Sequence, residues 1–132
     1  MTLAILLVLA GLMGAGGVML AAAGAHAAPG AGLDSAAYML LFHATAIMGA
    51  TALVQQGVLW RPLTFLVLAA WVAGAVLFSG DIALRAFAGH RLFPMAAPSG
   101  GIILILAWLG FAAAAIGALV RGCSPVIKVS TF

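Results

Sequence analysis

Four long apolar segments leave almost all of the charged side chains of this chain between them or at its ends. They cover residues Thr2–Ala27, Ala36–Val54, Pro62–Gly80 and Gly100–Val120. Of the 132 residues, 67% are hydrophobic and 5% are charged. A water-soluble fold of this size would expose a large apolar surface to water, whereas a bilayer solvates such a surface. About 20 apolar residues cross roughly 30 Å of hydrocarbon, so the sequence predicts an all-α integral membrane protein with four spans.

Helix-breaking and helix-starting residues divide the chain into one transmembrane domain of four helices. The predicted helices cover about 2–27, 35–54, 62–87 and 99–120. The segment after Pro29 ends the first helix, and Asp34 or Ser35 is expected to cap the second. Pro62 suits the first turn of the third helix, and Ser99 is expected to cap the fourth. Because the connections are short, we expect a four-helix bundle with antiparallel neighbours and both termini on the same side.

The first segment has one feature of a secretory signal, because Ala25-His26-Ala27 has the small-x-small pattern of a cleavage site. However, no basic residue precedes the segment, and the segment is longer than the 7–15 apolar residues of a typical signal core. We therefore expect it to be retained as a membrane helix.

The basic residues favour one orientation of the chain in the membrane. Arg61, Arg121 and Lys128 fall on the side of the termini, and Arg85 and Arg91 fall on the other side. Cytoplasmic loops carry an excess of basic residues, so we expect both termini in the cytoplasm. No basic stripe with interleaved aromatic residues accompanies the net charge of +3, so we expect no nucleic-acid partner.

Four polar residues are candidates for a site, namely His26, His43, Asp81 and Arg85. The antiparallel path is expected to bring them together toward the non-terminal side at a common membrane depth. His43 follows Ser35 by about eight residues, which places it roughly 12 Å along its helix and inside the hydrocarbon. Asp81 and Arg85 are four residues apart and can form an ion pair on one helix face. The cluster is either a structural network or a proton path or anion site.

Small residues are abundant on the first and fourth segments. The candidates for close helix packing are Gly11, Gly14, Gly24, Gly110 and Gly117. Such residues let helix backbones approach closely in lipid, where burial of apolar surface no longer drives association. They serve either packing within the chain or a docking face for a partner.

The sequence lacks the patterns of common catalytic or cofactor sites. Ser79, Ser99 and Ser124 have no matching base and orienting carboxylate in a recognisable arrangement. Two histidines without ligand-spaced cysteines or carboxylates do not predict a metal or haem site. Cys123 is the single cysteine, which leaves a weak acylation site as its one candidate role. We therefore expect no enzymatic activity and no cofactor.

Several short motifs occur in order along the chain. They are Gly24-Ala25-His26, Phe42-His43-Ala44, Leu77-Phe78-Ser79-Gly80, Pro98-Ser99-Gly100-Gly101 and Trp108. With these motifs the chain resembles the Domain of Unknown Function 423 family of small four-helix membrane proteins, which is related to the transmembrane protein 256 family of eukaryotes. The resemblance implies the fold and the membrane location, and it implies no reaction.

The chain departs from the family pattern at two positions. The family tends to place an aromatic residue four positions before the helix-two histidine, where this chain has Met39, with Tyr38 one position earlier. The serine that commonly follows the Ser-Gly pair is replaced by Asp81. The Asp81–Arg85 pair is therefore a feature of this chain rather than one that the resemblance implies.

Two classes of function agree with these observations. The first is a structural or accessory subunit that packs in the bilayer against a larger complex of the bacterial inner membrane. The expected partners of the chain are the lipid bilayer and either a membrane protein or a second copy of the chain. The second is a small transporter or proton-conducting element that uses His26, His43, Asp81 and Arg85. The small size and the lack of a soluble domain favour the first class.

Overall fold

The computed structural model describes residues 2–120, which form four α-helices. They are α1 (Thr2–His26), α2 (Leu33–Gln55), α3 (Arg61–Ala88) and α4 (Ala96–Val120). Each helix is long and apolar enough to cross a membrane. The prediction of an all-α protein with four potential membrane spans is therefore confirmed. The expectations for Arg121, Cys123, Ser124 and Lys128 concern positions outside the described residues.

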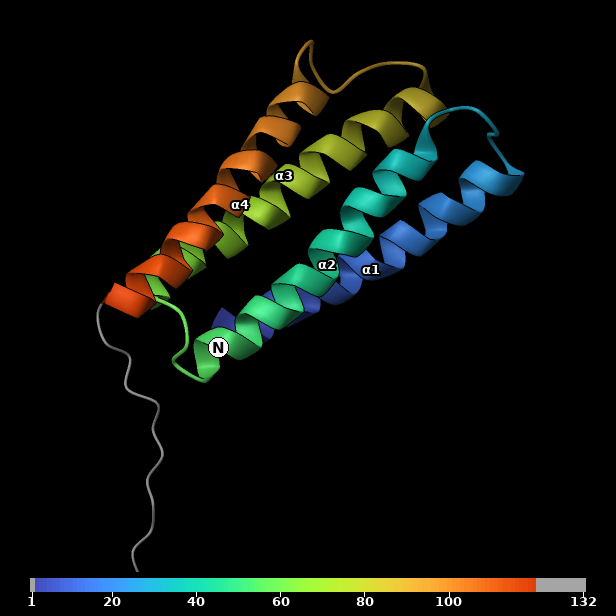
Figure 1. The fold of residues 1–132 in the computed structure, drawn as a ribbon. Coiled ribbons are helices and arrows are strands. Elements are labelled where there is room, and N and C mark those ends of the chain that lie inside the picture. Colours follow the sequence, from blue (N-terminus) through green and yellow to red (C-terminus); the bar gives the residue numbers. More distant parts are fainter. Residues whose placement is uncertain (1, 121–132) are drawn as a thin grey trace, which may run out of the picture.

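The helices run alternately up and down, so each is antiparallel to the next (Figure 1). One end of the bundle carries the α1–α2 and α3–α4 connections, residues 27–32 and 89–95, and is called the double-loop end. The opposite, terminal end carries the start of α1, the α2–α3 connection and the end of α4. The expected placement of the two ends of the chain on one side is thus confirmed for residues 2 and 120.

Helices α2 and α3 form the centre of the bundle, while α1 packs mainly on α2 and α4 packs on α3. The fully buried side chains of Ile47, Leu68 and Trp71 come from these two central helices. The outer helices α1 and α4 bury a smaller part of their surface and turn large aliphatic side chains outward. Such a distribution is the one expected for a small bundle in lipid, which solvates the outer apolar faces.

The start of α2 differs from the prediction. The N-cap residue is Gly32, which adopts the left-handed conformation with φ 75° and makes no side-chain capping bond. Ser35 instead donates its hydroxyl hydrogen to the Gly32 carbonyl at 2.8 Å. The expected cap by Asp34 or Ser35 is therefore wrong. The helix begins earlier than predicted because Leu33 is buried against α1 and α3 as part of its first turn.

The start of α4 also lies earlier than predicted, at Ala96. Ser99 donates to the carbonyls of Met95 and Ala96 at 2.7 and 3.0 Å, so it is a first-turn residue and not the cap. Pro98 falls in this turn, where its missing N–H leaves no helical bond unmade. At the start of α3, Pro62 occupies the first turn as the sequence predicted.

Two pairs of helices approach so closely that a side chain would not fit between them. A Cβ added at Gly100 of α4 would lie 2.7 Å from the backbone nitrogen of Phe78 and 2.9 Å from the carbonyl of Gly74, both in α3. A Cβ added at Gly17 of α1 would lie 2.7 Å from Leu41 of α2. These glycines are the points of closest packing, which is how helices associate in lipid.

The five glycines singled out from the sequence lie in different surroundings. An added Cβ would lie 3.0 Å from an α3 side chain at Gly110 and 3.3 Å from the first turn of α2 at Gly24. At Gly117 it would lie 3.9 Å from an aromatic ring of the α2–α3 connection. At Gly11 and Gly14 it would meet nothing within 4 Å. The last two glycines therefore lie away from the helix contacts of residues 2–120.

Candidate functional site

His43 is buried in the middle of α2, with 4% of its surface exposed. Its Nδ1 lies 2.7 Å from the carbonyl oxygen of Met39, and its Nε2 lies 3.2 Å from the indole Nε1 of Trp108 in α4. An indole N–H can only donate, so Nε2 is the acceptor and Nδ1–H donates to Met39. This pairing assigns His43 the neutral Nδ1–H tautomer. Both ring nitrogens are used, and the Trp108 bond ties α2 to α4.

Aromatic rings surround the imidazole. The ring centroid of His43 lies 6.3 Å from that of Trp71 and 6.0 Å from that of Trp108. Trp71 packs in turn on Trp108 at 4.6 Å and on Phe111 at 5.2 Å. Offset and tilted ring pairs at these distances are favourable beyond their burial. We name His43, Trp71, Trp108 and Phe111 the aromatic cluster, and it joins the three helices α2, α3 and α4.

Two buried polar atoms of the central helices have no hydrogen-bond partner among the described residues. They are the hydroxyl oxygen of Thr51 and the indole nitrogen of Trp71. An unpaired buried donor costs about 1–3 kcal/mol. At Trp71 this free-energy cost has to be offset by the ring contacts with His43, Trp108 and Phe111.

Ser79 provides a second polar link between the central helices. Its hydroxyl, which is buried, donates to the carbonyl oxygen of Ala36 at 2.8 Å. The bond crosses from α3 to the first turns of α2 and fixes which residues of the two helices lie at the same level. A serine hydroxyl held in this way is a structural link rather than a free nucleophile.

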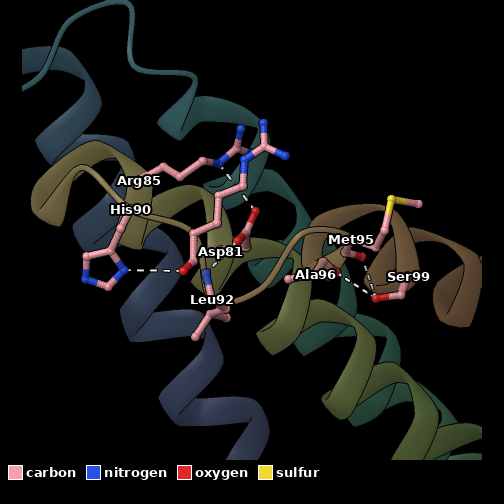
Figure 2. Close-up of polar contacts among 8 residues, drawn as sticks. Asp81, Arg85, His90, Leu92, Met95, Ala96 and Ser99 are labelled. Carbon is pink, nitrogen blue, oxygen red and sulfur yellow. Dashed lines mark hydrogen bonds and ion pairs between the residues drawn. The ribbon is translucent and has the colours of Figure 1, made fainter.

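Asp81 holds the α3–α4 connection against the end of α3 (Figure 2). Its carboxylate is buried, with 2% of the residue exposed. One oxygen accepts the backbone N–H of Leu92 at 3.0 Å, and the other lies 3.3 Å from Nε of Arg85. The ion pair predicted from the four-residue spacing is confirmed. Arg85 is 40% exposed on its side chain, so the buried anion sits beneath a partly exposed cation.

The four candidate residues do not form one cluster at a common depth. His43 lies beside Trp71 of α3, and Asp81 is ten residues further along the same helix, roughly 15 Å away along its axis at 1.5 Å per residue. His26 is exposed at the end of α1. The expectation of a shared depth is therefore wrong. The prediction used only the order in which the helices begin and end. In the structure, the Ser79–Ala36 contact sets the register of α2 and α3.

The partners of His43 were not predicted from the sequence. Trp108 is 65 residues away from it in the chain, and no local spacing connects the two positions. Tyr38 is exposed, and its ring stacks on Phe42 at a centroid distance of 6.0 Å. The histidine thus takes its polar contact from a tryptophan of α4 in place of a tyrosine of its own helix.

The described part of the chain contains no group of three or more His, Cys, Asp or Glu residues that could hold a metal ion. The arrangement that it does contain can orient and immobilise a neutral imidazole, bury a carboxylate under a guanidinium and close a loop.

The family model described as "Protein of unknown function (DUF423)" matches residues 20–101. The matched region runs from the last turns of α1 to the beginning of α4 and includes His43, Ser79 and Asp81, while Trp108 lies beyond it. No curated protein and no solved structure matches the chain.

Proposed function

The chain belongs to the DUF423 family of proteins of unknown function, and on that premise we propose that it is a non-enzymatic, multi-pass protein of the bacterial inner membrane that serves as an accessory subunit of a larger membrane complex. The competing function is a small transporter or proton-conducting element. The two differ in what they require of the buried polar residues, because a conducting element needs groups that exchange protons.

The bonding of His43 is the observation that carries the proposal. A proton relay needs a ring nitrogen that can accept a proton from a path, but Nε2 already accepts from the indole N–H of Trp108. Protonation of Nε2 would set two N–H donors against each other and break the bond between α2 and α4. The same imidazole that a relay would use is thus part of what holds the bundle together.

The other polar groups support the same interpretation. Ser79 and Ser99 donate their hydroxyl hydrogens to backbone carbonyls, so neither is presented to a base as a nucleophile. Asp81 has both oxygens engaged by the chain itself. Because these polar side chains bond to other groups of the chain, they fit a scaffold better than a catalyst or a channel.

The outer surfaces of α1 and α4 support an accessory role. Met19 of α1 and Leu109 of α4 are 66% and 63% exposed. A membrane protein can turn such aliphatic faces to lipid or to the helices of a neighbour, since both are equally apolar. The proposal assigns at least one of these two faces to a protein neighbour, and it places both termini in the cytoplasm on the basic residues of the sequence.

Photo-crosslinking in intact membranes tests the proposal. A photoreactive residue is placed at Leu109 on the exposed side of α4 or at Met19 on α1, with Leu104 as the matched control because it is a leucine of α4 that is 4% exposed. We expect one protein adduct of defined higher mass from at least one exposed position and none from Leu104. The adduct is then identified after purification in a mild detergent.

Two outcomes contradict the accessory role. Adducts confined to lipid at both exposed positions, together with a monomeric mass in native-lipid particles, would show that the chain has no stable protein neighbour. An adduct of twice the mass of the chain would assign the outer face to self-association instead.

A further inference from the structure

A cavity with a cationic wall lies at the double-loop end, between the α1–α2 connection and the last turns of α3. It has a volume of about 550 Å³ and is lined by the Gly30–Gly32 turn, Ser35, Ile82, Arg85 and Ala86. Another hollow, of about 350 Å³ between α1, α2 and α3, is lined almost wholly by aliphatic side chains. The two hollows thus suit different occupants, and the cavity beside Arg85 is the polar one.

Arg85 is positioned by its own ion pair. Asp81 engages the inner guanidinium nitrogen, Nε, at 3.3 Å. A guanidinium is a planar fork of five N–H donors that matches the oxygens of a phosphate. The side chain of Arg85 is 40% exposed, whereas the carboxylate of Asp81 that holds its Nε is buried. The pair therefore restrains the orientation of the guanidinium, while part of this side chain stays exposed and lines the cavity.

Neither acidic residue of the chain is among the residues that line this cavity. The chain has two of them, Asp34 and Asp81. Asp34 lies against α1, because a Cβ added at Gly24 would be 3.3 Å from its Oδ1. Asp81 is buried beneath Arg85, and neither carboxylate lines the cavity. The charged group that the cavity presents is thus a cation, which is complementary to an anionic ligand.

The turn opposite Arg85 leaves room for a ligand. A Cβ at Gly30 or Gly32 would meet nothing within 4 Å, so no side chain fills that side. The first turn of α2, which follows Gly32, has no side-chain cap, and its N–H groups add weakly to the positive potential.

The cavity lies at the depth of the lipid headgroups. Helix α3 has 28 residues and is therefore about 42 Å long at 1.5 Å per residue. With α3 centred on the bilayer and perpendicular to it, a hydrocarbon core of roughly 30 Å leaves about 6 Å of helix beyond each boundary, which is about four residues. Arg85 begins the last four residues of α3. Its guanidinium is thus placed where the phosphate groups of the membrane are found.

We propose that this cavity is a binding site for a phosphate group, with Arg85 as its principal ligand. Two sources carry this chemistry at such a depth, the headgroup of an anionic phospholipid and free inorganic phosphate. The inference is independent of the accessory role, because it assigns a ligand to the chain by itself.

The test compares three probes on the whole purified chain in a non-ionic detergent. They are phosphatidylglycerol, diacylglycerol with the same acyl chains, and inorganic phosphate at constant ionic strength. Bound lipid is counted by native mass spectrometry, and the midpoint of thermal unfolding is followed for all three. We expect phosphatidylglycerol to bind one molecule per chain and to raise the midpoint, and diacylglycerol to do neither.

Two matched variants separate the cavity from general electrostatics. Ala31→Asp places a carboxylate in the cavity on an exposed turn residue, and Ala27→Asp places the same charge on an exposed residue of the same connection that does not line the cavity. We expect about a tenfold or greater loss of affinity for phosphatidylglycerol in Ala31→Asp, because a charge-assisted bond is opposed, and none in Ala27→Asp. Arg85→Lys, which keeps the charge but loses the fork, is expected to bind with intermediate affinity.

Each outcome decides the question. A gain in midpoint with inorganic phosphate that Ala31→Asp abolishes, without binding of phosphatidylglycerol, supports the site with free phosphate as its source. Equal binding of phosphatidylglycerol and diacylglycerol, without an effect of inorganic phosphate, overturns the proposal. An equal loss of affinity in Ala31→Asp and Ala27→Asp also overturns it, because the attraction would then belong to the surface as a whole.

Discussion

Replacement of Gly100 by alanine is expected to destabilise the bundle, whereas the same replacement at the next residue, Gly101, is expected to stabilise it. The two glycines lie on the same turn of α4 but face different surroundings. A Cβ at Gly100 would lie 2.7 Å from the backbone nitrogen of Phe78, while one at Gly101 would have its nearest neighbour at 4.0 Å. The pair thus differs in the space available and not in the residue that is introduced.

The magnitude follows from the contact at Gly100. Non-bonded carbon atoms rest at about 3.5–4.0 Å, so the added Cβ would be too close to the Cβ of Phe78, at 3.0 Å, by roughly 0.5 Å or more, and it would lie still closer to the backbone nitrogen of Phe78. The obstructing atom belongs to the backbone of α3 and cannot rotate away, so α4 has to move as a whole turn. Overpacking of this kind costs about 1–3 kcal/mol. Alanine also gains about 1 kcal/mol over glycine in a helix interior.

The gain in helix propensity is common to both variants and cancels in their difference. Gly101→Ala should therefore be more stable than Gly100→Ala by about 1–3 kcal/mol, the overpacking cost alone. The assay is equilibrium unfolding of the purified chain in mixed micelles, read from the tryptophan fluorescence of the aromatic cluster. Equal stability of the two variants within about 0.5 kcal/mol would refute the close crossing of α3 and α4, since ordinary surface substitutions fall in that range.

Three further predictions concern the buried polar groups and the orientation. His43→Gln, which can still donate and accept, should retain the fold, whereas His43→Leu should lose about 1–3 kcal/mol of stability by stranding its former partners; normal folding of the glutamine variant with loss of a histidine-dependent proton flux in vesicles would refute the scaffold role. Asp81→Asn should lower stability, and adding Arg85→Gln should recover part of the loss, because one unpaired charge is worse than none; additive losses would show that the two groups are uncoupled. Reporter fusions after Phe132 and within residues 28–33 should place the termini in the cytoplasm and the loop outside, and a C-terminal reporter active only outside the cytoplasm would reverse this orientation.

The spans of the fold could be predicted because they depend on local sequence. Apolar length gave the four helices, and the breakers around Pro29 and Pro62 gave their approximate ends. The Asp81–Arg85 pair was equally local, since a spacing of four residues fixes it on one helix face. The caps of α2 and α4 were wrong because burial of Leu33 and Ala96 extends each helix beyond the nearest polar residue.

The contacts between helices could not be predicted in the same way. The sequence contains many glycines, and the ones at the closest crossings, Gly17, Gly74 and Gly100, are selected by the rotation of each helix about its axis. That rotation depends on all neighbouring side chains at once. The bond between His43 and Trp108 likewise depends on the register of α2 and α3 and on the tilt of α4. The depth assigned to the candidate site failed for this reason.

The division of contacts among the helices has a consequence for the biogenesis of the protein. Each consecutive pair, α1 with α2 and α3 with α4, is a helical hairpin in which the two helices pack closely at a glycine, Gly17 in the first pair and Gly100 in the second. Polar bonds, from Ser79 to Ala36 and from Trp108 to His43, instead cross between the hairpins.

We therefore expect each hairpin to insert into the bilayer and to pack without the other. The polar groups between the hairpins then stay unpaired until the two hairpins dock. We expect insertion of the hairpins to come first and their docking last, with His43 and Ser79 governing the final step. If the chain is divided within the α2–α3 connection, the two polypeptides should then associate in the membrane through the Ser79–Ala36 and Trp108–His43 bonds.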